Sequence, residues 1–137
     1  MIKIRKYQHQ DKTFLVDLWK KVFPDAPAHN EPSRMLDEKL AIDDMIFIAE
    51  VNGAIVGACM AGYDGHRGWL YAVAVLPEFR RKYIGTQLVE FAMQALKTKG
   101  CKKVNLQIRS TNTKVASFYQ SLGFAAEDRM SMGAFIK

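Results

Sequence analysis

The spacing of hydrophobic and polar residues changes several times along the chain, and each change predicts a new element. Residues 2–7 alternate between apolar and polar side chains, which predicts a short strand. From Asp11 the apolar residues recur at helical spacing until Pro24, which predicts a helix that ends there. The apolar spacing of residues 35–40 predicts a second, shorter helix.

Three apolar runs in the middle of the chain predict an antiparallel meander. The first two runs, Met45–Val51 and Ala54–Tyr63, are separated only by Asn52-Gly53. Asn-Gly between two apolar runs indicates a tight hairpin, because both residues tolerate the positive φ that such a turn requires. A second turn at residues 64–68 leads into the third run, Trp69–Leu76.

The rest of the chain predicts helices and strands in alternation. The expected elements are a helix at Ile84–Lys99 closed by Gly100, a strand at Val104–Ile108, a helix at Asn112–Leu122 closed by Gly123, and one or two strands from Phe124 onward. Because a helix joins the strands at 69–76 and 104–108, we expect these strands to be parallel, with a right-handed crossover. The expected fold is mixed α/β, in the order β-α-α-β-β-β-α-β-α-β-β, within a single domain of residues 1–137.

Composition is that of an ordinary globular protein, with 49% hydrophobic and 25% charged residues. The longest apolar run falls far short of the roughly 20 residues that span a bilayer, and the N-terminus lacks the apolar core of a signal peptide. We therefore expect a cytoplasmic protein without a membrane partner. Cys59 and Cys101 have no metal-ligand spacing, so we expect no metal and assign both a structural role, with a reactive thiol as the alternative.

Positive charge is gathered at one place, Arg80-Arg81-Lys82, at the start of the helix predicted from Ile84. Cations are unfavourable at a helix N-terminus, and a bound anion would relieve the conflict. Gly85 would let a ligand approach the backbone closely. Residues 80–86 are therefore a candidate phosphate or pyrophosphate site, the alternative being a solvated charge cluster. The net charge of +6 would also suit weak nucleic-acid binding, but no basic aromatic stripe or recognition helix accompanies it, so we expect no nucleic-acid partner.

Two segments carry a resemblance to a known family. The segment Val75–Leu88 resembles motif A of the GCN5-related N-acetyltransferases (GNAT), usually written Gln/Arg-x-x-Gly-x-Gly/Ala. Arg80 matches its first position and Gly85 its last, whereas Tyr83 stands where the first glycine is usual. The segment Asn112–Phe124 resembles motif B, in which an asparagine precedes a tyrosine and a Gly-Phe pair. Since the order of elements also agrees, the resemblance covers nearly the whole chain.

The resemblance implies an acetyl-CoA-dependent N-acetyltransferase that acetylates a primary amine by direct attack in a ternary complex. Segments 49–57 and 62–68 are similar to the YpeA-like branch of the family. By resemblance, the residues that bind acetyl-CoA are Arg80, the backbone amides of Arg81, Lys82, Tyr83, Ile84, Gly85 and Thr86, the strand residues Ala72, Val73, Ala74 and Val75, and the motif B residues Asn112 and Tyr119.

The same resemblance implies two catalytic groups. The backbone N–H of Val73 would stabilise the oxyanion that develops on the thioester carbonyl. Tyr119 would protonate the departing thiolate, the alternative being a tyrosine of the hydrophobic core. Asn112 would contact pantetheine or cap its helix, and these two roles are compatible.

The general base is less clearly marked. Many GNAT relatives carry a carboxylate on the fourth strand, but residues 69–75 contain none. The remaining candidates nearby are Asp64, His66 and Glu50, and Tyr71 is a candidate for positioning a water molecule. His66 titrates in a useful range, but it lies in a predicted turn, where an exposed structural histidine is the alternative.

The acceptor amine is left open by the sequence. In this fold the loop between the first two helices, here Phe23–Glu31, usually selects the substrate, and its acidic residues would attract a cationic amine or simply be solvated. One alternative is a transferase acting on a protein or peptide amine. Another is a non-catalytic acyl-CoA-binding or sensing domain, for which the missing strand carboxylate and Tyr83 argue. A homodimer is compatible with the family.

Overall fold

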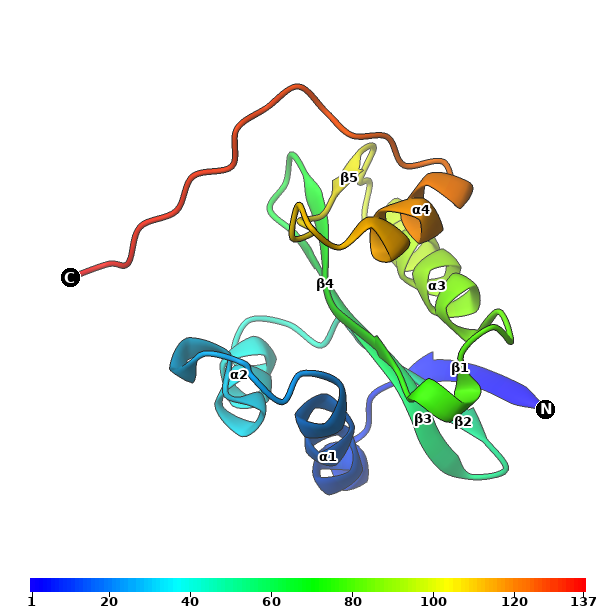
Figure 1. The fold of residues 1–137 in the computed structure, drawn as a ribbon. Coiled ribbons are helices and arrows are strands. Elements are labelled where there is room, and N and C mark those ends of the chain that lie inside the picture. The colour runs from blue at the N-terminus through cyan, green and yellow to red at the C-terminus, as the bar shows by residue number, and fades with distance from the viewer. The chain divides into compact units, whose positions relative to one another are not determined.

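The computed structural model describes all 137 residues, which form two compact units, Met1–Gln107 and Ile108–Lys137. The first unit holds a five-stranded sheet in the order β1-β2-β3-β4-β5 with helices packed on it (Figure 1). Its elements are β1 (Ile2–Lys6), α1 (Lys12–Val22), α2 (Pro32–Leu40), β2 (Ile46–Val51), β3 (Ala54–Tyr63), β4 (Gly68–Val75), α3 (Ile84–Thr98) and β5 (Val104–Asn105). The second unit contains α4 (Thr113–Ser121) and a C-terminal segment without helix or strand.

The structure confirms the mixed α/β fold and most of the predicted elements. The hairpin between β2 and β3 turns at Asn52 and Gly53, with φ values of 51° and 82°. These positive values are the conformation for which Asn-Gly is favoured. The first four strands are antiparallel in sequence order, and β4 pairs with β5 in parallel, as expected for strands joined through a helix.

Two predictions about the C-terminal half are wrong. The strand predicted at Val104–Ile108 is only two residues long, Val104–Asn105. The segment from Phe124 forms no strand, so the last two strands of the predicted order are absent. Its apolar residues are interrupted by Glu127-Asp128-Arg129, and its last ones remain open to solvent, with Phe135 76% and Ile136 97% exposed. A strand is stabilised by pairing with a sheet edge, and this segment pairs with none.

The core of the first unit lies on both faces of the sheet. Helices α1 and α2 cover one face, where the buried side chains include Leu15, Leu18, Trp19, Leu36, Ile46, Ile48 and Met60. Helix α3 covers the other face, and there the rings of Phe47 and Phe91 meet edge to face at 5.4 Å between centroids. Gly57 allows α3 to pack close to the sheet, because an added Cβ would lie 3.1 Å from a Leu88 methyl and 3.0 Å from the Ala74 carbonyl oxygen.

Strand β4 is only partly paired on the side of β5. The parallel pairing consists of Gly68 with Val104 and Trp69 with Asn105. From Leu70 to Val75, β4 therefore continues without a strand beside its outer edge. The backbone groups of this half of β4 are available to an extended ligand, which could pair with them as a further strand does.

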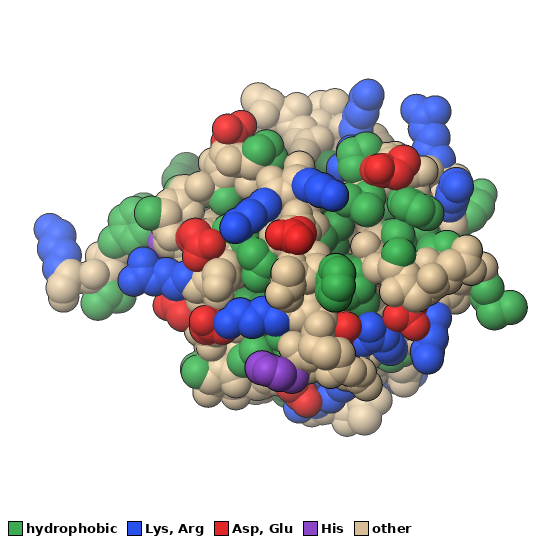
Figure 2. All heavy atoms as spheres, turned by 90° about the horizontal axis from the view of Figure 1, so that it is seen from below, with side chains coloured by type: hydrophobic (Ala, Val, Ile, Leu, Met, Phe, Trp, Pro, Cys, Tyr) green, Lys and Arg blue, Asp and Glu red, His purple; other side chains and the backbone are tan.

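No helix is long and apolar enough to cross a membrane. On the face drawn in Figure 2, Lys and Arg side chains are interspersed with Asp and Glu, and hydrophobic side chains lie between them. The net positive charge is therefore not gathered into one continuous patch on this face.

Candidate active site

A β-bulge interrupts β4 at the residues for which the sequence predicts the oxyanion donor. Opposite β4, Met60 of β3 pairs with Tyr71 and Ala58 pairs with Ala74, so that two residues, Ala72 and Val73, lie opposite Cys59 alone. Ala72 has a φ of 52°, in the left-handed region that residues with a Cβ rarely adopt. Bulges redirect backbone groups out of the ladder and are common beside active sites. This bulge is therefore the point in β4 where a backbone N–H can serve a ligand.

The Ala72 carbonyl is held from the other side by α1. The indole Nε1–H of Trp19 donates a hydrogen bond of 3.1 Å to this oxygen. Trp19 is fully buried and contributes to the core between α1 and the sheet. The bulge is thus joined to the rigid centre of the first unit.

The turn between β4 and α3 presents backbone amides and cations together. Arg81 and Tyr83 have φ values of 64° and 62°, so two residues with side chains are left-handed within three positions. Tyr83 is the N-cap of α3 and makes no side-chain capping hydrogen bond. The first N–H groups of a helix have no partner within the helix, and without a side-chain cap they can bind an anion. Tyr83 is 78% exposed, so its ring points outward and leaves the backbone of the turn open.

The cations of this turn have no carboxylate partner. Arg80 Nε donates to the Val75 carbonyl oxygen at 3.1 Å, which ties the turn to the end of β4. The Lys82 ammonium lies 5.4 Å from the centre of the Phe79 ring. The salt bridges of the chain involve other cations. The charge of Arg80, Arg81 and Lys82 therefore remains uncompensated beside the N-terminus of α3, as expected for an anion site.

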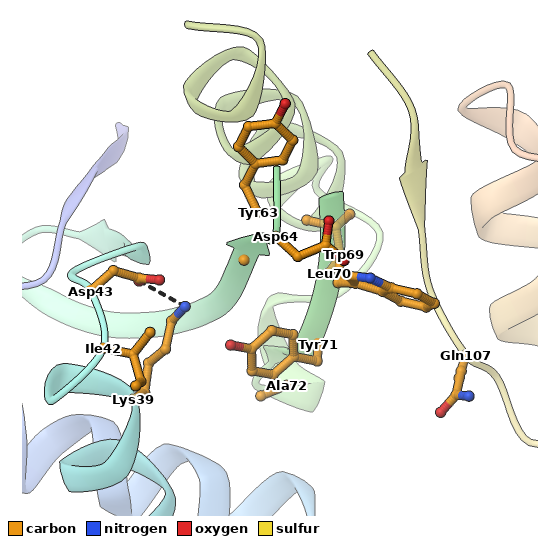
Figure 3. Close-up of a pocket in the computed structure, with 11 residues that line it drawn as sticks. Lys39, Ile42, Asp43, Tyr63, Asp64, Trp69, Leu70, Tyr71, Ala72 and Gln107 are labelled. Carbon is orange, nitrogen blue, oxygen red and sulfur yellow. Dashed lines mark ion pairs between the residues drawn. The ribbon is translucent and has the colours of Figure 1, made fainter. Parts of the chain in front are cut away.

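An open cavity of about 630 Å³ lies beside β4 from Trp69 to Ala72 (Figure 3). This volume lies within the range of small-molecule pockets. The cavity is lined by Lys39, Ile42, Asp43, Gly62, Tyr63, Asp64, Trp69, Leu70, Tyr71, Ala72 and Gln107. Because Ala72 belongs both to this lining and to the bulge, the cavity and the bulge are contiguous.

One wall of the cavity is built on a buried lysine at the end of α2. Lys39 Nζ lies 2.7 Å from Asp43 Oδ1, donates to the Ala61 carbonyl oxygen at 2.6 Å, and lies 5.5 Å from the centre of the Tyr71 ring. The close-up shows Lys39 directed at Asp43, with the Tyr71 phenol facing them (Figure 3). Lys39 and Asp43 largely neutralise each other, so the charge of this wall is small. Asp64 adds a negative charge to the lining.

The candidate bases occupy different surroundings. Asp64 lines the cavity, but its Oδ1 accepts the backbone N–H groups of His66 and Arg67 at 2.8 and 2.7 Å. These hydrogen bonds, with Arg67 first, lower the pKa of Asp64. His66 is exposed, and its ring nitrogen lies 2.8 Å from the Arg67 guanidinium. Glu50 lies at the end of β2, paired with Arg5 at 3.3 Å, and does not line the cavity.

The motif B residues lie on α4, in the second unit. Asn112 is the N-cap of this helix and accepts the Val115 N–H at 3.3 Å, so the predicted capping role is confirmed. Tyr119 is buried, and its ring packs edge to face on Phe118 and Phe124 at 4.9 and 5.5 Å between centroids. The roles of Asn112 and Tyr119 toward a ligand stay predictions.

A family model matches most of the chain. Residues 12–124 match the model described as the acetyltransferase (GNAT) family. The chain belongs to this family. The match begins at the first residue of α1 and ends after α4, so it includes the β4 bulge, the turn at residues 80–86 and the motif B helix.

Similar proteins agree with membership of the GNAT family. An acetyltransferase of Sodalis glossinidius is 36% identical over 93% of this chain and 89% of its own length. An acetyltransferase of Pectobacterium atrosepticum is 35% identical over 96% of this chain and 94% of its own. Among solved structures, the aminoglycoside N-acetyltransferase AAC(6')-Iy in complex with CoA has a TM-score of 0.82 at 23% identity, over 98% of this chain and 95% of its own. The structural likeness establishes the GNAT fold.

Neither cysteine of this acetyltransferase has the properties of a nucleophile. Cys59 is fully buried opposite the bulge, and burial raises the pKa of its thiol to about 12. The thiol is therefore protonated at neutral pH, and thiolate is the reactive form. Cys101 is half-buried, and its Sγ donates to the Lys103 carbonyl oxygen at 3.3 Å. Both observations agree with the structural role predicted for these residues.

The structure brings together the predicted residues of β4 and of the turn at 80–86, since both flank the end of one strand. Two parts of the cavity were not predicted from the sequence, namely the wall made by Lys39 and Asp43 and the place of Trp69 in the lining. A pattern could have revealed the first, because Lys39 shares a helical face with Met35 and Leu36 and stands four residues before Asp43. The run at 69–75 gives no such indication for Trp69, since all its residues are apolar.

Proposed function

We propose that this protein transfers the acetyl group of acetyl-CoA to a primary amine held in the cavity beside β4, by direct attack in a ternary complex. One observation carries the proposal. The β4 bulge lies between the cavity at one end and the cationic turn of residues 80–86 at the other. A thioester bound along β4 would therefore have its acyl carbon at the cavity and its phosphates at the turn.

The turn at residues 80–86 suits the pyrophosphate of the coenzyme. Uncapped amides at the start of α3 and three unpaired cations favour an anion of high charge. The left-handed residues Arg81 and Tyr83 keep the turn tight, so successive N–H groups can point to one centre. Binding here would offset the repulsion between Arg80, Arg81 and Lys82.

Pantetheine would extend along the unpaired half of β4. Its amide groups can pair with the backbone of Ala72–Val75, because β5 leaves this edge of the strand uncovered. An acyl group at the bulge would then lie within reach of the Val73 N–H. A donor aimed at the developing oxyanion contributes about 3 kcal/mol to stabilising the transition state.

The proposed transfer proceeds directly from acetyl-CoA to the amine and needs no acyl-enzyme intermediate. The neutral amine forms the new C–N bond, the C–S bond breaks, and the thiolate of CoA takes a proton, which we assign to the Tyr119 hydroxyl. The amine nitrogen loses a proton to solvent, either directly or through a water molecule beside Tyr71, and solvent restores the Tyr119 proton. Asp64 is a weak base at neutral pH because its pKa is lowered. We therefore assign Asp64 the role of attracting the ammonium form of the substrate, and His66 remains the alternative base.

The first test is the release of free CoA from acetyl-CoA in the presence of tyramine, spermidine or a peptide with a free N-terminal alanine. When both substrate concentrations are varied, double-reciprocal plots of the initial rate should give intersecting lines, since both substrates must be bound before transfer. Tyr119→Phe should lower kcat about 100-fold and leave the dissociation constant of acetyl-CoA nearly unchanged. Parallel lines would indicate an acyl-enzyme and contradict direct attack. Binding of acetyl-CoA without transfer to any amine would favour the non-catalytic alternative.

A matched pair of variants tests the cofactor site. Arg81→Ser removes a cation from the turn, and Lys97→Ser removes one from the last turn of α3, at the opposite end of the same helix. We expect Arg81→Ser to weaken acetyl-CoA binding about fivefold and Lys97→Ser to leave it unchanged, because only Arg81 would face the pyrophosphate. Equal effects in calorimetric titrations would show that only the net charge matters, and would refute the site.

A further inference from the structure

We propose that Trp19 is a positioning residue for acetyl transfer, which fixes the direction of the Val73 N–H through its hydrogen bond to the Ala72 carbonyl. The inference rests on the proposed function, because the Val73 N–H acts on an acyl group only if acetyl-CoA binds along β4. Its structural part can be observed without any reaction.

The peptide bond between Ala72 and Val73 couples the Trp19 hydrogen bond to the Val73 N–H. The carbonyl of Ala72 and the N–H of Val73 belong to the same planar unit, and the chain contains no cis peptide bond. In a trans peptide these two groups point in opposite directions. Because the Ala72 oxygen is directed at Trp19, the Val73 N–H must point away from Trp19. One hydrogen bond therefore orients both groups.

The bulge needs such a restraint. Ala72 has a φ of 52°, which is unfavourable for a residue with a Cβ, so contacts around Ala72 must hold the backbone in this conformation. A bulge also lacks the regular ladder that holds the other peptides of β4 in place. The fully buried indole of Trp19 supplies the restraint from a helix 53 residues away in sequence.

The same hydrogen bond satisfies the indole N–H of Trp19, which is a polar group buried in the core. Trp19 belongs to a buried apolar cluster that also includes Leu15, Leu36 and Met60. A buried indole N–H usually finds an acceptor, and here the acceptor is the Ala72 carbonyl. The rigid packing of the ring thus gives the bond a fixed direction, which is what an oxyanion donor requires.

Two changes at Trp19 remove the donor. Trp19→Phe keeps an aromatic ring but leaves a small cavity, whereas site-specific replacement of the indole by benzothiophene keeps the ring shape and lacks only the N–H. Leu96→Ala is the control, because Leu96 is fully buried on α3, which covers the face of the sheet opposite Trp19, and it takes no part in the packing of the Trp19 ring. All variants are compared at a temperature where circular dichroism shows them folded.

Both Trp19 changes should lower kcat about 10- to 100-fold, with KM values for acetyl-CoA and the amine changed by less than about twofold. Leu96→Ala should retain kcat. In ¹⁵N-labelled protein without substrate, the Val73 amide resonance should shift in both Trp19 variants and stay in place in Leu96→Ala. An unchanged kcat in the benzothiophene variant of an active enzyme would overturn the inference.

Failure of the proposed function has a different signature. If the unmodified protein transfers acetyl to none of the three amines, the catalytic role of Trp19 falls with the proposed function. The Val73 resonance then decides the structural part. A shift on loss of the indole N–H would uphold the control of this peptide by Trp19, and an unchanged resonance would refute it.

Discussion

Substitution of Tyr83 tests whether the turn at residues 80–86 is strained, because the Tyr83 backbone is left-handed and its ring is exposed to solvent. Its φ is 62°, and 78% of the residue is exposed. The left-handed conformation costs a residue with a Cβ about 1–2 kcal/mol. Tyr83→Gly removes this strain, gives up little burial, and adds about 0.5–1 kcal/mol of conformational entropy to the unfolded chain. The net expectation is a free energy of unfolding that rises by up to about 1.5 kcal/mol.

For a chain of this length, 1 kcal/mol corresponds to an increase in Tm of about 4 °C. The assay is urea unfolding followed by circular dichroism, with a thermal scan as a second measurement. The acetyl-CoA affinity of Tyr83→Gly should be equal or higher, because the exposed ring contributes nothing to the amides of the turn and glycine lets a phosphate approach them more closely.

Arg80→Gly in the same turn is the control with the opposite sign. Arg80 has a φ of −72° and a ψ of 161°, so glycine relieves no strain there. The substitution also removes the hydrogen bond to the Val75 carbonyl. Arg80→Gly should therefore lower the free energy of unfolding, by about 1 kcal/mol. If Tyr83→Gly destabilised the protein as much as Arg80→Gly does, the argument from left-handed strain would be wrong.

Two further predictions concern buried charge in the first unit. Lys39→Met should lower the free energy of unfolding by about 2–3 kcal/mol in urea titrations, because Asp43 and the Ala61 carbonyl both lose their partner; an unchanged value would contradict the assigned pair. The hydrogen bond from Arg5 lowers the pKa of Asp11, so its contribution to stability is present above the unfolded pKa of about 3.9 and is lost as the pH falls through the lower folded value. Asp11→Asn should accordingly flatten the decline in unfolding free energy below about pH 4, and an equal decline in both proteins would refute this assignment.

Local sequence patterns correctly predicted the strands, turns and helix ends that depend on the conformational preferences of neighbouring residues. Residues 54–63 form a strand with the predicted bounds, and the Asn52-Gly53 turn follows from the two residue types that tolerate positive φ. The helix at Ile84 begins where predicted, after the cationic turn. The residue types of that turn alone, without the family resemblance, also predict an anion site there.

Features that depend on tertiary contacts were not predictable. The apolar run at 69–76 carries no mark of a bulge, since Ala72 is left-handed without being a glycine. The hydrogen bond that holds it comes from Trp19, which the helical pattern identified only as a core residue. The segment from Phe124 has the apolar content of a strand, but it pairs with no strand of the sheet and forms none itself.

The most direct test of the central claim is a titration of ¹⁵N-labelled protein with acetyl-CoA and, separately, with free CoA. Both ligands should shift the amide resonances of residues 81–86, because both carry the pyrophosphate. Acetyl-CoA should shift the Val73 resonance further than CoA does, since only acetyl-CoA carries the thioester carbonyl oxygen that this N–H is proposed to contact. Shifts confined to other parts of the chain, or a Val73 resonance that responds equally to both ligands, would contradict the assignment of β4 as the site of acetyl transfer.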